Sequence, residues 1–150
     1  MNVRAVRGAT QLDTDSRDHM LDRVAEMVRE VMTSNDLDVD DFISIIFTAT
    51  SDLHAEFPAY AARQLGFSDV PLICARELEI EGSMPRVVRM MAHVETEASR
   101  QDVTHVYLHG AAALRRDLDR VKAMPDEPPH EVPGGARSAR GDHDSAGTPT

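Results

Sequence analysis

The sequence has few aromatic residues, a single cysteine and no long apolar run. Aromatic residues make up 4% of the 150 residues and tryptophan is absent, so the core must be built from Val, Leu, Ile, Met and Ala. The one cysteine, Cys74, excludes an internal disulfide framework and is typical of a reducing compartment. The N-terminus lacks an apolar signal segment, and no stretch approaches the length of a membrane span. We therefore expect a cytoplasmic protein with no membrane partner.

Positive charge is also scarce. The chain has 26 acidic and 16 basic residues, a formal net charge of −10. Nucleic acids and anionic membranes select proteins with a basic surface, so neither is an expected partner. All basic residues except Lys122 are arginine. Arginine abundance is thus a compositional bias, and only the placement of particular arginines can indicate an anion site.

The composition changes near Met124. Residues 125–150 hold five of the eight prolines and four of the eight glycines, and Val132 is their only large aliphatic residue. Such a segment cannot bury enough apolar surface to offset the entropy lost on ordering. We expect one domain over residues 1–124 and an acidic, disordered tail over 125–150.

Hydrophobic periodicity predicts alternating strands and helices within residues 1–124. Two helices are indicated, one by apolar residues at helical spacing and the other by a proline at its start and a glycine just after its end. Runs of β-branched residues indicate five strands. The predicted strands are 3–8, 42–49, 70–74, 87–95 and 105–112, and the predicted helices are 15–34 and 58–65. This order predicts an α/β (α+β) fold, with a single-domain mixed β-sheet and helices packed on one face.

Arginines inside apolar strands are the most informative residues. Arg89 lies in VVRMMAHV, where its guanidinium must reach either water or an anion. The residue alone leaves a structural ion pair and an anion-binding role equally open. Arg4 and Arg7 are three apart in a strand and point to opposite faces. Arg7, beside Gly8 at the predicted strand end, is the better candidate for a site.

Other polar residues have an ordinary structural interpretation when taken singly. Glu77 lies in CARELEIEG beside two further glutamates, a pattern typical of a solvated face, and a lone Cys74 is usually a small buried hydrophobe. His105 and His109 are predicted on one strand face without a further ligand, so we expect no metal site. No glycine-rich phosphate loop is present, and no cofactor is expected.

Five segments together resemble one enzyme family. They are RGAT (7–10), TATSDLHAEFPAYAAR (48–63), CARELEIEG (74–82), VVRMMAHV (87–94) and HVYLHGAAALRRDL (105–118). In this combination and order, the chain resembles the monofunctional chorismate mutases of the trimeric pseudo-α/β-barrel type, which are distinct from the all-helical chorismate mutases. The resemblance runs from Met1 to about Leu118.

The resemblance implies an isomerase that converts chorismate to prephenate by a Claisen rearrangement, on the route to Phe and Tyr. It also implies a homotrimer with three active sites, each between neighbouring subunits. By matching motif, one set of substrate-binding residues would come from one subunit and a second set from its neighbour. The first set is Arg7, Arg89, Tyr107 and Arg115, the second is Phe57, Arg63, Cys74 and Glu77, and Leu114 would line the pocket.

The family also implies a role for most of these residues. Arg89 would stabilise the negative charge that grows on the breaking ether oxygen. Arg7 and Tyr107 would bind a carboxylate, while Glu77 would accept a hydrogen bond from the ring hydroxyl and hold Arg89 in place. Cys74 would be a pocket contact and not a nucleophile, so the catalytic residues would be Arg89, Glu77 and Arg7.

The resemblance leaves some assignments open. Either Arg115 or Arg116 could face the site, with Arg115 favoured by alignment, and either Arg120 or Lys122 could close over the substrate. The alternative function is a small-carboxylate-binding trimer of related fold, either similar to the reactive-enamine deaminases or without catalysis. The arginine-centred C-terminal signature of those deaminases is not visible in this sequence.

Overall fold

The structure is a computed structural model that describes residues 1–116. The predicted tail at 125–150, together with Arg120 and Lys122, lies outside the described residues. The strands are β1 (Asn2–Gln11), β2 (Phe42–Ala49), β3 (Leu72–Arg76), β4 (Val87–Thr96) and β5 (Val106–Leu108), and the helices are α1 (Arg17–Ser34) and α2 (Pro58–Gln64). Two short 3₁₀ helices, η1 (Val39–Asp41) and η2 (His109–Ala111), precede β2 and follow β5.

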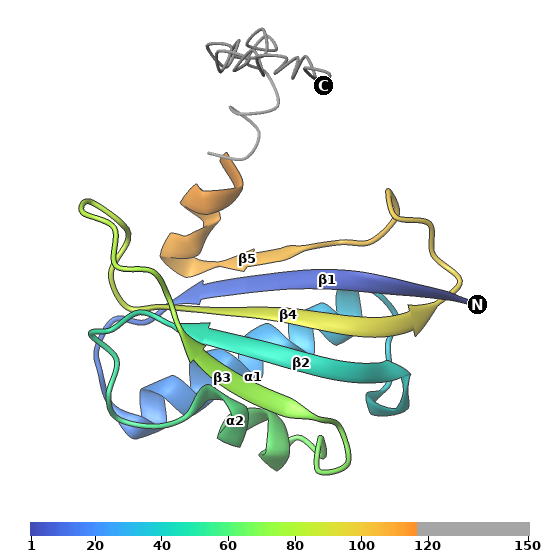
Figure 1. Cartoon of the computed structure of the whole chain (residues 1–150), viewed down its shortest axis with the longest axis horizontal. Coiled ribbons are helices and arrows are strands. Elements are labelled where there is room, and N and C mark those ends of the chain that lie inside the picture. The colour runs from blue at the N-terminus through green and yellow to red at the C-terminus, as the bar shows by residue number, and fades with distance from the viewer. Residues whose placement is uncertain (117–150) are drawn as a thin grey trace, which may run out of the picture.

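The strands form one mixed sheet in the order β3-β2-β4-β1-β5. The central pairs β1–β4 and β2–β4 are antiparallel, whereas the outer pairs β2–β3 and β1–β5 are parallel. Figure 1 shows both helices behind the sheet, with α1 along its length and α2 below it. The prediction of a mixed sheet with helices on one face is therefore confirmed. We call the opposite side, which neither α1 nor α2 covers, the open face.

Strand alternation separates the core from the open face. The side of the sheet that meets α1 and α2 carries fully buried residues such as Val6, Phe47 and Val88. Helix α1 covers them with one apolar stripe, at Met20, Val24, Met27, Val28 and Val31. Phe42 and Phe67 extend this core through an edge-to-face contact, with ring centroids 4.9 Å apart.

The open face receives the intervening residues of each central strand, which include two arginines. In the antiparallel register Arg7 pairs with Met91 and Ala9 pairs with Arg89. Arg7 and Arg89 are therefore diagonal neighbours on one face, a relation that spans about 7–8 Å between backbones. The pairing of β1 with β4 thus brings together two cations that are far apart in the sequence.

One local prediction differs from the structure. The strand predicted over 105–112 ends at Leu108, because His109 has a left-handed backbone with φ of 53° and begins η2. His105 and His109 therefore do not share a strand face. At the start of α1, Ser16 is the N-cap residue but its side chain makes no capping hydrogen bond. The carboxylate of the preceding Asp15 instead accepts hydrogen bonds from the backbone N–H groups of His54 and Ala55.

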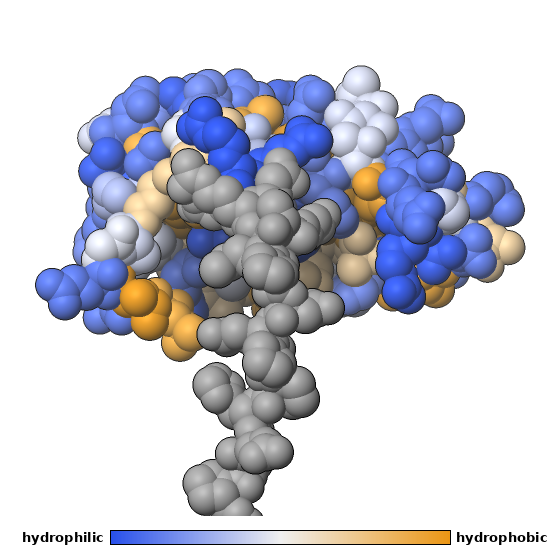
Figure 2. Space-filling model, turned by 90° about the horizontal axis from the view of Figure 1, so that it is seen from above, coloured by the Kyte–Doolittle hydropathy of each residue, from blue (hydrophilic) through white to orange (hydrophobic). Residues whose placement is uncertain are grey.

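The outer surface reflects the charged composition. The side of the molecule seen in Figure 2 is mostly hydrophilic, with hydrophobic side chains in a few separate groups. Within residues 1–116, no helix combines the length and the apolar character needed to cross a membrane.

Candidate active site

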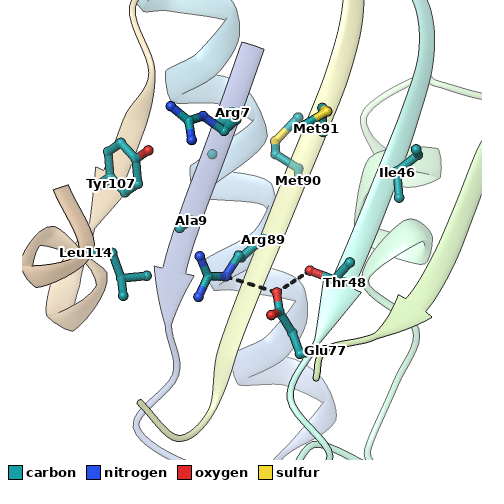
Figure 3. A pocket seen from close by; sticks show the side chains of 11 residues that line it. Arg7, Ala9, Ile46, Thr48, Glu77, Arg89, Met90, Met91, Tyr107 and Leu114 are labelled. Atoms are coloured by element: carbon teal, nitrogen blue, oxygen red, sulfur yellow. Dashed lines mark hydrogen bonds and ion pairs between the residues drawn. The ribbon is translucent and has the colours of Figure 1, made fainter. Parts of the chain in front are cut away.

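A cavity of about 590 Å³ lies on the open face, over the ends of β1, β2 and β4. Its volume falls within the range of small-molecule sites, roughly 300–1,000 Å³. Its lining is mainly apolar and includes a few convergent polar groups (Figure 3). The lining residues are Arg7, Gly8, Ala9, Ile46, Thr48, Glu77, Arg89, Met90, Met91, Tyr107 and Leu114.

The Glu77 carboxylate contacts two other residues that line one side of this cavity. The Glu77 Oε1 atom lies 2.9 Å from Arg89 Nε and accepts a hydrogen bond of 2.5 Å from the Thr48 hydroxyl. The Arg89 side chain remains 45% exposed. Because the pair engages Arg89 through Nε, both terminal nitrogens of the guanidinium extend into the hollow seen in Figure 3. The ion pair therefore orients Arg89 and leaves its outer donors available for a ligand.

A second cation and an aromatic ring form the other wall. Figure 3 shows the Arg7 guanidinium extending toward Tyr107, with Leu114 beside them. The backbone N–H of Arg7 donates to His105 Nδ1 at 3.0 Å, which ties β1 to the segment before β5. The Arg7 guanidinium itself makes no hydrogen bond or ion pair with residues 1–116. Arg7 is thus a charge without a partner in an apolar cavity, as an anion site requires.

The position of Glu77 corrects one expectation. The resemblance placed Glu77 with Phe57, Arg63 and Cys74 on the neighbouring subunit, but Glu77 contacts Arg89 of its own chain. Strand alternation explains the difference. Cys74 and Arg76 share one face of β3, so the residue that follows Arg76 turns to the open face beside Thr48.

A second cavity, of about 420 Å³, contains two of the other predicted residues. It lies between β3 and the 50–58 loop, and its lining includes Phe57, Cys74 and Arg76. Phe57 is 68% exposed although it is a large aromatic side chain. The predicted residues therefore line two separate cavities, with Arg7, Glu77, Arg89, Tyr107 and Leu114 in the first and Phe57 and Cys74 in the second.

Two predicted arginines line neither cavity. Arg63 lies exposed in the last turn of α2, and Arg115 lies exposed beside Leu114 at the end of the described chain. Conversely, Thr48 and Arg76 line the cavities and were not predicted. Thr48 is an ordinary β-branched strand residue and carries no signal in the sequence. Arg76 directly precedes Glu77, and its signal was a charged residue at the end of an otherwise apolar strand.

The loop that carries Phe57 is held by carboxylates. Partial burial opposes ionisation of Asp52, but hydrogen bonds from the Thr50 hydroxyl and the Arg86 backbone N–H outweigh it and lower the pKa of Asp52. The hydrogen bond from the Phe57 backbone N–H, assisted by Arg17, lowers the pKa of Glu56. A lowered pKa in the folded state means that both carboxylates stabilise the fold at neutral pH, and that this contribution is lost as the pH falls through the folded pKa.

We therefore expect the free energy of unfolding to decrease more for the wild type than for the double variant Asp52→Asn/Glu56→Gln when the pH is lowered from 7 to 3. Urea unfolding midpoints between pH 7 and pH 3 measure this difference. Asp22→Asn, which changes an exposed carboxylate of α1, serves as the control and is expected to keep the wild-type pH dependence. Parallel pH profiles for wild type and double variant would contradict the role assigned to the loop carboxylates.

The described residues offer no obvious metal centre. Within residues 1–116, no group of three or more His, Cys, Asp or Glu side chains is arranged to hold a metal ion. The polar groups of the first cavity are two guanidinium groups, a carboxylate, a hydroxyl and a phenol. Such a set can bind and orient a carboxylate-bearing molecule and place positive charge beside a reacting oxygen.

Comparisons with known proteins show which family the chain resembles over most of its length. The family model for chorismate mutase type I matches residues 3–118. The chain is 33% identical over 123 residues to the chorismate mutase AroH of Bacillus subtilis (strain 168), an alignment that covers 81% of this chain and 97% of the relative. It is 39% identical over 121 residues to the chorismate mutase AroH of Thermus thermophilus, which covers 80% and 99% of the two chains.

A solved structure supports the same assignment. The chorismate mutase from Clostridium thermocellum, Cth-682, aligns with a TM-score of 0.72 and 41% sequence identity, over 73% of this chain and 97% of that one. The family model covers most of the chain, and the paired cations of the open face lie within the matched region. The chain belongs to the chorismate mutase type I family.

Proposed function

We propose that this protein is a chorismate mutase, an isomerase that converts chorismate to prephenate in the biosynthesis of Phe and Tyr. This activity is supported by the family match and by the similarity to the curated relatives. The observation that supports this site is the ion pair by which Glu77 orients Arg89 in the cavity that Arg7 also lines. The single unpaired Cys74 agrees with the cytoplasmic location expected from the sequence, which remains a prediction.

The chemistry requires no acid, base or nucleophile from the protein. The rearrangement is pericyclic, so one carbon–oxygen bond breaks as one carbon–carbon bond forms, with no proton transfer and no covalent intermediate. A protein can accelerate it by holding the substrate in its compact, chair-like conformer. It can also place positive charge where negative charge grows on the ether oxygen. The second role is assigned to Arg89, whose outer nitrogens extend into the cavity (Figure 3).

The remaining groups of the first cavity bind and orient the substrate. Arg7 and Tyr107 are assigned to one carboxylate of chorismate, because the Arg7 guanidinium offers two parallel donors and makes no hydrogen bond or ion pair within residues 1–116. The free lone pairs of Glu77 can accept a hydrogen bond from the ring hydroxyl. Leu114 and the aliphatic residues of the open face close the apolar part of the cavity.

The second cavity and the exposed apolar residues support a homotrimer with sites between subunits. Ile73 on β3 is 59% exposed, and Val3 and Met91 on the open face are also exposed. β3 lies at an edge of the sheet, where an uncovered strand favours contact with another chain. In this arrangement the second cavity of one subunit, with Phe57 and Cys74, completes the first cavity of its neighbour.

A direct assay tests both parts of this proposal. Purified protein is expected to remove the ultraviolet absorbance of chorismate, with prephenate as the product, and light scattering is expected to give the mass of a trimer. Dilution into the monomer range should abolish turnover, because no single chain holds a complete site. A folded trimer without turnover would contradict the proposed activity but not the assigned fold. A monomer that stays fully active would contradict the proposal that each site lies between two subunits.

A further inference from the structure

The first cavity contains less positive charge than its proposed substrate requires. Arg7 and Arg89 contribute two positive charges and Glu77 contributes one negative charge, so the formal sum is +1. Chorismate has two carboxylates and is a dianion at neutral pH. Under the proposed function, one further cation is needed to balance the bound substrate, because a buried anion without a partner is strongly disfavoured.

The second cavity contains one candidate for this cation. Arg76 is the last residue of β3 and lines the cavity together with Phe57 and Cys74. Cys74 and Arg76 are two residues apart in a strand, so their side chains leave the same face. Arg76 is exposed and makes no hydrogen bond or ion pair with any residue of the described range 1–116. It is therefore available to a ligand.

The other charge in this cavity is already satisfied. Glu56 Oε2 lies 2.9 Å from Arg17 Nε, and Glu56 Oε1 accepts a hydrogen bond from the Phe57 backbone N–H. Arg17 does not line the cavity, but it pairs with Glu56, so Arg76 is the charged lining residue that has no ion pair within residues 1–116. Arg76 would add one positive charge to the formal +1 of the first cavity, and the dicarboxylate needs one such further cation.

We propose that Arg76 is a substrate-binding residue that acts across the subunit interface and binds the carboxylate that Arg7 does not bind. The inference rests on the proposed function and adds a residue to it. Arg76 also has a specificity role, because it favours a dicarboxylate over an analogue that lacks one carboxylate. Arg63, the cation implied by resemblance, lies outside both cavities, whereas Arg76 lines one of them.

The expected effect of Arg76→Gln is on binding. The carboxylate keeps its charge from substrate to transition state, so its contact stabilises both states equally, and such a loss raises KM with little change in kcat. We expect KM for chorismate to rise about 10- to 100-fold, the range of a charge-assisted hydrogen bond, with kcat within about threefold of wild type. Arg29→Gln, on the exposed side of α1 and outside both cavities, is the matched control and should keep the wild-type KM.

Mixed trimers test whether Arg76 acts on the neighbouring subunit. Arg89→Ala chains keep an intact second cavity, and Arg76→Gln chains keep an intact first cavity. Co-refolding the two variants in equal amounts should place both intact halves in about one quarter of the sites, given random assembly into a closed ring. Those sites should recover turnover at the low KM of the wild type, which neither variant shows alone.

The outcomes separate this inference from the proposed function. A wild type without chorismate turnover overturns the proposed function itself. An active wild type with an unchanged KM in Arg76→Gln overturns only the role of Arg76, as does a rise in KM confined to Arg63→Gln. Mixed trimers that regain no low-KM turnover, although each variant is folded and trimeric, overturn the action across the interface.

Discussion

Arg89→Ala should lower kcat for chorismate by about 10²–10³-fold, the range observed when one preorganised donor to a developing oxyanion is removed. The side chain extends from β4 into a largely apolar cavity, where Glu77 fixes its orientation before the substrate arrives. A charge that is already oriented needs no reorganisation as the ether bond breaks, and this is why its removal affects the chemical step. The loss of chorismate absorbance under saturating substrate measures this effect.

The same variant separates catalysis from simple binding. Removing Arg89 also leaves Glu77 as an unpaired negative charge beside an anionic substrate, so KM should rise as well. Arg29→Ala removes an exposed arginine of α1 and is expected to keep the wild-type kcat. Circular dichroism and light scattering should show that both variants keep the fold and the mass of the wild type. A correctly folded Arg89→Ala protein with wild-type kcat would falsify the assignment of Arg89 to the ether oxygen.

Phe47→Ala should give the largest change in stability, a loss of about 3–5 kcal/mol in the free energy of unfolding. Phe47 is fully buried on β2, between the paired strands β3 and β4, and its side chain packs on the helix side of the sheet. The substitution removes apolar area from the core and leaves a cavity that the surrounding strands cannot fill. The expected loss is a large part of the total stability of a typical domain, about 5–15 kcal/mol.

Urea unfolding at one fixed protein concentration measures this loss, because association of subunits makes the midpoint depend on concentration. Leu78→Ala is a suitable control, since Leu78 is 83% exposed and its truncation should change stability by less than about 0.5 kcal/mol. Residual turnover of Phe47→Ala should follow its folded fraction, because Phe47 lines neither cavity. Equal midpoints for the two variants would contradict the placement of Phe47 in the core.

The fold class and most elements could be predicted from local patterns. The apolar stripe at helical spacing predicted the helix over 15–34, and the β-branched run predicted the strand over 42–49 that the structure contains as β2. These signals are local, because side-chain periodicity follows from the geometry of one helix or one strand. The strand over 105–112 was predicted too long, since the left-handed residue that ends it is His109 and not the adjacent Gly110.

The sequence alone also determined that Arg89 needed an explanation, because a guanidinium within an apolar strand requires water or an anion. The family resemblance then supplied the reaction and several of the residues that line the two cavities. The resemblance paired Glu77 with Arg89, as the structure does, but assigned Glu77 to the neighbouring subunit, and neither the pattern nor the resemblance singled out Arg76.

Only the tertiary structure decided which residues meet. Arg7 and Arg89 become neighbours because β1 pairs antiparallel with β4 in one particular register, and a slip of one residue would turn one of them into the core. Glu77 joins Arg89, while Cys74 and Arg76 face the second cavity, because successive residues alternate across the sheet beside β2. Periodicity specifies which face a side chain occupies, but strand order and register depend on contacts between distant segments, and these contacts place the predicted residues in two separate cavities.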